Sequence, residues 1–263
     1  MRRLLFSILT VIFAANAYGQ CTFKNTAFKG GEYLTYNLYY NWKFIWVKAG
    51  TASMSTVETV YNGKKAYRTS LMTRGNGRLD DFFVLRDTLL GYTTLDLAPL
   101  YYRKGAREGK RYTVDETFYS YSDGKVEVKM HRQNNDGTHS WETRTFDNCI
   151  YDMVNIFQRA RSFNPANWKE GYEVKINITD GTKVLDAKIK FSGRSTVKAD
   201  NGKKYKCLQL SYIECYDGKW REIARFHVTD DDHHIPVRLD MFLKFGSAKA
   251  FLTKDQTLNT IRK

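Results

Sequence analysis

Apolar and polar residues alternate with a period of two through much of this chain, which is the pattern of β-strands with one buried face. Residues 172–178 read YEVKINI, residues 185–191 read LDAKIKF and residues 239–245 read LDMFLKF. In each run every second residue is apolar, and the residues between are mostly polar. The pattern predicts strands that cover a core on one side and face water on the other.

Short turn signals separate these runs. An Asn-Gly or Asp-Gly pair lies at the centre of residues 61–64, 122–125, 135–138, 179–182, 200–203 and 216–219. Such pairs supply the positive φ angles that tight hairpin turns require. The sequence therefore predicts a meander of antiparallel strands.

One segment, residues 147–163, breaks the alternation. Its apolar residues recur at helical spacing, at Ile150, Met153, Val154 and Phe157. Asp147 or Asn148 is a candidate N-cap, and the Asn164-Pro165 pair ends the segment. We predict a mainly β fold, a curved antiparallel sheet or half-barrel, with one central α-helix at about residues 149–162 that covers the sheet.

The N-terminus has the layout of a secretory signal peptide, with Arg2 and Arg3 before an apolar run of about a dozen residues. We expect cleavage after Gly19. Residues 20–263 then form a single β-rich domain, or two sheet regions divided by the helix near residues 148–163. Cys21 raises the alternative of a lipidated cysteine, which is disfavoured because the preceding residue, Gln20, is not small.

The chain is basic, with a net charge of +14. Without Arg2 and Arg3, 40 basic residues face 28 acidic ones, which leaves a net charge of about +12. This balance favours anionic surfaces such as phospholipid head groups and acidic glycans. No basic helix with a nucleic-acid-binding motif is present, so nucleic acid is not an expected partner.

Four cysteines remain after cleavage: Cys21, Cys149, Cys207 and Cys215. Cys207 and Cys215 lie eight residues apart in one predicted strand, which separates them by about 26 Å and prevents their pairing. The other pairings stay open. Zinc-binding Cys and His spacings are absent, and we predict no metal, no cofactor and no catalytic residue.

The stretch Thr-Asp-Asp-Asp-His-His-Ile-Pro-Val at 229–237 gathers three carboxylates and two imidazoles. Strand-like runs lie on both sides of it, and Asp is common in turns because its carboxylate bonds nearby backbone N–H groups. Adjacent residues on one loop rarely surround a metal ion. We therefore favour a hairpin turn over a metal or acid/base site.

The aromatic run YLTYNLYYNWKFIW at 33–46 is the most suggestive candidate site. Trp42, Phe44 and Trp46 alternate, so on one strand they would share a face. Either these rings fill the core, or they bind an amphipathic ligand whose anionic head meets nearby lysines. The predicted ligand-binding residues are Trp42, Phe44, Trp46, Phe82, Phe83, Lys43 and Lys48.

Several motifs together resemble one family. They are Gly-Glu-Tyr-Leu-Thr-Tyr at 31–36, Lys-Ala-Gly at 48–50, Arg-Asp-Thr at 86–88 and Asp-Asp-Asp-His-His-Ile-Pro-Val at 230–237. They resemble the exported bacterial domain-of-unknown-function 3108 family. The resemblance implies a curved sheet with a covering helix, similar to the LolA and LolB lipoprotein carriers, which hold acyl chains inside an incomplete barrel. Family members often have arginine at the position of His234, which makes that imidazole a poor candidate for an essential ligand.

Taken together, these features favour an exported, non-enzymatic protein, periplasmic or outer-membrane-associated in a Gram-negative bacterium. The expected function is binding of a lipid, an acylated protein or another amphipathic envelope molecule in the concave face, with peripheral membrane contact. The alternative is a glycan- or protein-interaction module that uses a basic, aromatic sheet face. A hydrolase is the third and weakest interpretation, since no paired carboxylates face one another in the predicted strands.

Overall fold

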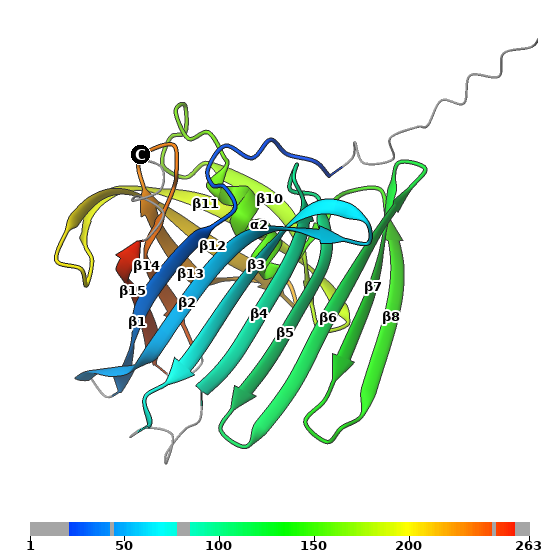
Figure 1. Ribbon diagram of the computed structural model, residues 1–263, viewed down its shortest axis with the longest axis horizontal. Helices are drawn as coiled ribbons and strands as arrows, with labels where there is room; N and C mark the ends of the chain where they lie inside the picture. The colour runs from blue at the N-terminus through cyan, green and yellow to red at the C-terminus, as the bar shows by residue number, and fades with distance from the viewer. Residues whose placement is uncertain (1–20, 43–44, 78–84, 244–245, 256–263) are drawn as a thin grey trace, which may run out of the picture.

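The computed structural model describes residues 21–42, 45–77, 85–243 and 246–255. The predicted signal peptide lies outside these residues. In the described part, fifteen strands form one sheet in the order β8-β7-β6-β5-β4-β3-β2-β1-β15-β14-β13-β12-β11-β10-β9 (Figure 1). The predicted fold class is therefore confirmed: a mainly β chain folds into one strongly curved, nearly closed sheet with an unsealed seam.

The strands are β1 (Glu32–Trp42), β2 (Ile45–Tyr61), β3 (Lys64–Gly75), β4 (Leu85–Thr94), β5 (Pro99–Glu108), β6 (Arg111–Ser122), β7 (Lys125–Gln133), β8 (His139–Phe146), β9 (Ile150–Tyr151), β10 (Glu173–Asp180), β11 (Lys183–Lys198), β12 (Lys204–Tyr216), β13 (Lys219–Thr229), β14 (Pro236–Phe242) and β15 (Ser247–Asp255).

Two antiparallel meanders make up the sheet. Strands β1 to β8 form one meander and β10 to β15 form the other, and they join where β1 pairs with β15. The short β9 pairs in parallel with β10 and ends the sheet on that side. Each of the six predicted turns joins two successive strands. The turn between β2 and β3, for example, has positive φ angles at Asn62 and Gly63. The turns that follow β1, β5, β7, β10, β12 and β14 lie at one end of the sheet, which we call the lower rim.

The helix α2 (Met153–Arg161) lies on the concave side of the sheet (Figure 1). Asp152 is its N-cap, because its side chain accepts the backbone N–H groups of Val154 and Asn155 at 3.0 Å. The predicted caps, Asp147 and Asn148, were wrong. The reason is that residues 150–151 pair with β10 as strand β9, so the helix begins later than its apolar spacing indicated.

Close contact with β4 positions this helix. A Cβ built on Gly91 of β4 would lie 2.7 Å from side-chain atoms of Asn155 and Val154. Val154 also packs against Leu89 and Tyr102 in a small buried cluster. Only glycine at position 91 allows this approach, so the helix seats directly on the inner face of the sheet.

A buried ion pair fixes the C-terminal end of α2. The Arg161 guanidinium donates to both carboxylate oxygens of Glu32 at 2.6 and 2.7 Å, and both side chains are 1% exposed. It also donates to the backbone carbonyls of His233 and His234 at 3.1 and 3.2 Å. Glu32 of the Gly-Glu-Tyr motif, the helix and the Asp-Asp-Asp-His-His stretch therefore meet in one network.

The Asp-Asp-Asp-His-His stretch is a turn between β13 and β14, as predicted. The Asp231 carboxylate accepts the backbone N–H groups of His233 and His234 at 3.0 and 3.2 Å, and Pro236 begins β14. The His234 ring is buried against the backbone carbonyl of Arg161. These contacts give the stretch a structural role.

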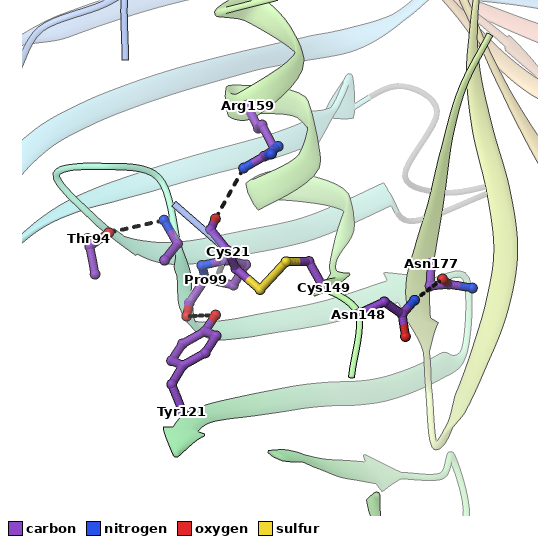
Figure 2. The surroundings of a disulfide bond; sticks show 9 residues. Cys21, Thr94, Pro99, Tyr121, Asn148, Cys149, Arg159 and Asn177 are labelled. Atoms are coloured by element: carbon purple, nitrogen blue, oxygen red, sulfur yellow. Dashed lines mark hydrogen bonds between the residues drawn. A yellow bond between two sulfur atoms is a disulfide. The ribbon is translucent and has the colours of Figure 1, made fainter. Parts of the chain in front are cut away.

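A disulfide joins Cys21 to Cys149, whose Cα atoms are 5.5 Å apart (Figure 2). Arg159 of α2 donates to the Cys21 carbonyl at 3.1 Å. Cys207 and Cys215 lie on β12 and are both free, so they do not pair with each other, as their spacing predicted. Because the Cys21 sulfur is part of the disulfide, it is not available for a lipid thioether.

Candidate functional site

The concave face is largely filled by the protein's own side chains. Between α2 and the inner faces of β11 to β13 lies an apolar cavity of about 40 Å³, lined by residues such as Phe157, Leu210 and Phe226. Pockets for small molecules commonly measure about 300–1,000 Å³. This cavity therefore has no space for an acyl chain.

The predicted aromatic strand is instead a hairpin. Trp42 is the last residue of β1 and pairs with Ile45, the first residue of β2. The prediction that Trp42, Phe44 and Trp46 share a face of one strand is therefore wrong, because the chain reverses within the run. Four of the predicted ligand-binding residues, Lys43, Phe44, Phe82 and Phe83, lie outside the described residues.

The two other predicted site residues, Trp46 and Lys48, are exposed near the start of β2. The ammonium group of Lys249 lies 4.2 Å from the centre of the Trp46 ring, within the range of a cation–π interaction. Trp46 lies opposite Asn41 and Lys48 opposite Tyr39. These residues place an exposed indole and basic groups at the lower rim.

A second hairpin brings further apolar residues to the same place. Strand β15 pairs with β1, so the end of β14 and the start of β15 lie beside the end of β1 and the start of β2. The two hairpins expose Ile45 (66%), Trp46 (40%), Val47 (38%), Phe242 (43%) and Leu243 (47%). We call these five residues the tip patch.

The strand register shows how the tip patch is arranged. Trp46 pairs with Asn41, Asn41 with Ser247, and Ser247 with Phe242, so the four residues form one row across the lower rim. Neighbouring strands lie about 4.8 Å apart, which places the Cα atoms of Trp46 and Phe242 about 14 Å apart. The row ends in an aromatic ring on each side.

Basic groups accompany both rings. Lys249 lies over Trp46, and the Arg225 guanidinium lies 5.8 Å from the centre of the Phe242 ring. Arg225 also donates to both carboxylate oxygens of Glu222, at 2.8 and 2.9 Å, and this hydrogen bonding raises its pKa. The rim thus combines exposed apolar side chains with cations, an arrangement suited to an amphipathic anionic partner.

Of these rim residues, the sequence predicted Trp46 and Lys48 as ligand-binding residues and did not indicate Ile45, Val47, Phe242, Leu243 or Lys249. The alternating run at 239–245 was assigned as a strand throughout, whereas β14 ends at Phe242. No local signal shows that residues 45–47 and 242–243 meet, because their contact depends on the pairing of β1 with β15.

The described residues contain no group of three or more His, Cys, Asp or Glu side chains that could hold a metal ion. Within the same part of the chain, no helix is long and apolar enough to cross a membrane.

Comparison with known proteins gives a family and a fold. The family model described as "Protein of unknown function (DUF3108)" matches residues 35–253. A solved β-barrel-like protein of the domain of unknown function DUF1849 from Brucella abortus is similar, with a TM-score of 0.54 and 13% sequence identity over 85% of this chain and 96% of that chain. No curated protein matches the sequence.

Proposed function

Because the chain belongs to the DUF3108 family of proteins of unknown function, we propose its role from its geometry: a non-enzymatic envelope protein that attaches to anionic membrane surfaces through the tip patch. The single observation behind this proposal is that two neighbouring hairpins expose five large apolar residues at the same end of the sheet. In this proposal the lipid contacts the lower rim of the sheet. The sequence had instead favoured lipid binding in the concave face.

The tip patch suits shallow insertion into the head-group region. Full burial of a large apolar side chain contributes about 1.5–3 kcal/mol, so inserting five partly exposed side chains contributes on the order of 5 kcal/mol. Each lysine or arginine near an anionic surface adds about 1 kcal/mol. Trp46 beneath Lys249 places an indole and a cation together, as is common at membrane interfaces. The sum corresponds to reversible, peripheral binding.

The proposed location is the periplasm or the outer membrane of a Gram-negative bacterium. The Cys21–Cys149 disulfide supports export, because disulfides persist in oxidising compartments and are rare in the cytosol. The net charge of +14 supports an anionic partner.

Vesicle flotation tests the proposal. The mature, oxidised protein is mixed with vesicles of phosphatidylcholine alone or with phosphatidylglycerol added. We expect binding to the phosphatidylglycerol vesicles, and we expect the double variant Ile45→Ser/Leu243→Ser to bind roughly 10- to 30-fold more weakly, as the loss of about 2 kcal/mol of apolar insertion requires.

Val60→Ser is the matched control, because Val60 lies near the other end of β2 and is 63% exposed. This variant should bind like the wild type. Equal losses in the control and the double variant, or no binding to either vesicle, would overturn the proposal. Retention on acidic glycans that the double variant does not weaken would favour the interaction-module alternative.

A further inference from the structure

A second hollow lies at the lower rim, on the inner side of the sheet near its seam. Its volume is about 130 Å³, larger than that of the apolar cavity beside α2. The lining comes from β5, β6, β7 and the end of β10, and consists of Lys104, Ala106, Arg111, Thr113, Asp115, Arg132 and Asp180. We call it the polar pocket.

Two contacts across the seam form its outer wall. The Thr117 hydroxyl on β6 donates to the Thr179 hydroxyl on β10 at 3.2 Å. A Cβ built on Gly181, in the turn after β10, would lie 2.7 Å from the Arg132 guanidinium. The turn therefore packs against Arg132 and places Asp180 beside the three basic side chains.

Asp115 presents an unused acceptor in this pocket. The residue is 8% exposed, and its Oδ1 atom is buried without a hydrogen bond to any described residue. The nearest cationic group, the Arg132 guanidinium, lies 3.6 Å from Oδ1. A buried acceptor without a donor costs about 1–3 kcal/mol, which a ligand hydroxyl at this point would recover.

The basic side chains of the pocket are incompletely neutralised. Asp180 already accepts a hydrogen bond from the Tyr216 hydroxyl at 3.1 Å. Among the described residues, the side chains of Lys104 and Arg111 form no hydrogen bond and no close ion pair, although Lys104 lies opposite Asp115 and its charge acts on that carboxylate. Three cationic side chains and two carboxylates line the pocket, which leaves an excess of one positive charge. The pocket opens to solvent beside the exposed Arg111 side chain.

We propose that the polar pocket binds a small phosphate-bearing polyol, with the phosphate against Lys104, Arg111 and Arg132 and a neighbouring hydroxyl donating to Asp115 Oδ1. Arginine side chains match the oxygen geometry of a phosphate, and their fixed charge suits a dianion. A cavity of about 150 Å³ accommodates a six-membered ring, so this pocket has space for the phosphate and the adjacent carbon with its hydroxyl. The pocket does not depend on the tip patch, since the two share no residue.

Isothermal titration calorimetry with the mature, oxidised protein tests the proposal, with glycerol 3-phosphate, inorganic phosphate and glycerol as the probes. We expect glycerol 3-phosphate to bind more tightly than inorganic phosphate, and glycerol to give no signal. Arg111→Ala should weaken binding about tenfold, the usual effect of losing one charge-assisted hydrogen bond. Lys110→Ala is the control, since it removes a neighbouring exposed charge that does not line the pocket.

Asp115→Asn separates the two halves of the proposed site. This variant should bind inorganic phosphate about as well as the wild type or better, but should lose the preference for glycerol 3-phosphate. No binding by the wild type, or equal losses in Arg111→Ala and Lys110→Ala, would overturn the proposal, because the latter result indicates only diffuse charge attraction. An unchanged preference in Asp115→Asn would overturn the role of the hydroxyl.

The same chemistry occurs in a lipid head group and in a free sugar or polyol phosphate. Short-chain phosphatidylglycerol, used below its micellar concentration, distinguishes these sources. If the short-chain phosphatidylglycerol competes with glycerol 3-phosphate for binding to the wild type but not to Arg111→Ala, the pocket binds a lipid head group. Absence of competition, with the pocket variants behaving as expected, supports a free phosphate ester.

Discussion

Replacing Glu32 by Gln should lower the free energy of unfolding by about 3–5 kcal/mol, because it leaves a buried guanidinium without a counter-ion. In the native protein Glu32 and Arg161 are each 1% exposed, and two hydrogen bonds of 2.6 and 2.7 Å join them. The charge on Arg161 remains when the carboxylate becomes an amide, and no water reaches it. The loss is a large fraction of the roughly 5–15 kcal/mol that stabilises a typical domain.

The assay is urea denaturation at pH 7 with the disulfide intact, followed by far-UV circular dichroism and tryptophan fluorescence, and analysed by linear extrapolation. Glu173→Gln is the control. Its partner Lys188 lies 3.0 Å away, but both side chains are partly exposed, so the loss should be at most about 1 kcal/mol.

A double variant distinguishes a buried charge from lost packing. Glu32→Gln combined with Arg161→Met removes both charges, so the combined loss should be smaller than the sum of the two single losses by about 2 kcal/mol or more. A Glu32→Gln loss no larger than that of Glu173→Gln would refute the reasoning. So would strict additivity in the double variant.

Three further predictions follow from the same structure. Cys21→Ser should lower the free energy of unfolding by up to about 4.9 kcal/mol, the chain-entropy value for a disulfide that joins residues 128 positions apart, and urea titration with and without reductant checks it. Burial raises the pKa of Asp152 from its ordinary 3.8 to about 7, so between these two pH values the native state holds a proton that the unfolded chain has lost. The stability of the wild type minus that of Asp152→Asn should therefore fall as the pH rises from about 4 to 7 and stay level above about 8. A rise of this quantity over the same pH range would contradict the prediction. Gly91→Ala should cost about 1–3 kcal/mol in thermal or urea unfolding, because the new methyl group would lie 2.7 Å from side chains of α2. Gly105→Ala should cost less, because the nearest atom to its methyl group would be the flexible end of Arg103 at 3.1 Å, with the Tyr112 hydroxyl at 3.6 Å.

The strands and their turns could be predicted from the sequence because both signals are local. Alternation shows which face of a strand is buried, and the Asn62-Gly63 pair supplies the two positive φ angles that a tight hairpin requires. The reversal between Trp42 and Ile45 was missed because the sequence there contains no Asn-Gly or Asp-Gly pair. The N-cap at Asp152 was missed because residues 150–151 have apolar side chains that suit a helix and a strand equally.

The two candidate sites depend on contacts between distant parts of the chain. The tip patch exists because β1 pairs with β15, which brings residues near 45 beside residues near 242. Lys104, Asp115 and Arg132 are polar residues at alternating positions, so in sequence they match the pattern of a solvated strand face. They become the wall of a pocket because the sheet curves and the turn after β10 covers them. Curvature and closure have no signature within a single strand.

The central claim, that the tip patch enters an anionic membrane surface, is tested most directly by fluorescence quenching with brominated lipids. The chain has five tryptophans, and Trp46 alone belongs to the tip patch. We predict that vesicles of brominated phosphatidylglycerol quench part of the emission of the wild type and that this component decreases in Trp46→Phe. It should persist in Trp141→Phe, whose indole is 52% exposed on β8 and also has a lysine over its ring. Quenching that is undiminished in Trp46→Phe, or that disappears in Trp141→Phe, would show that another surface meets the lipid and would contradict the claim.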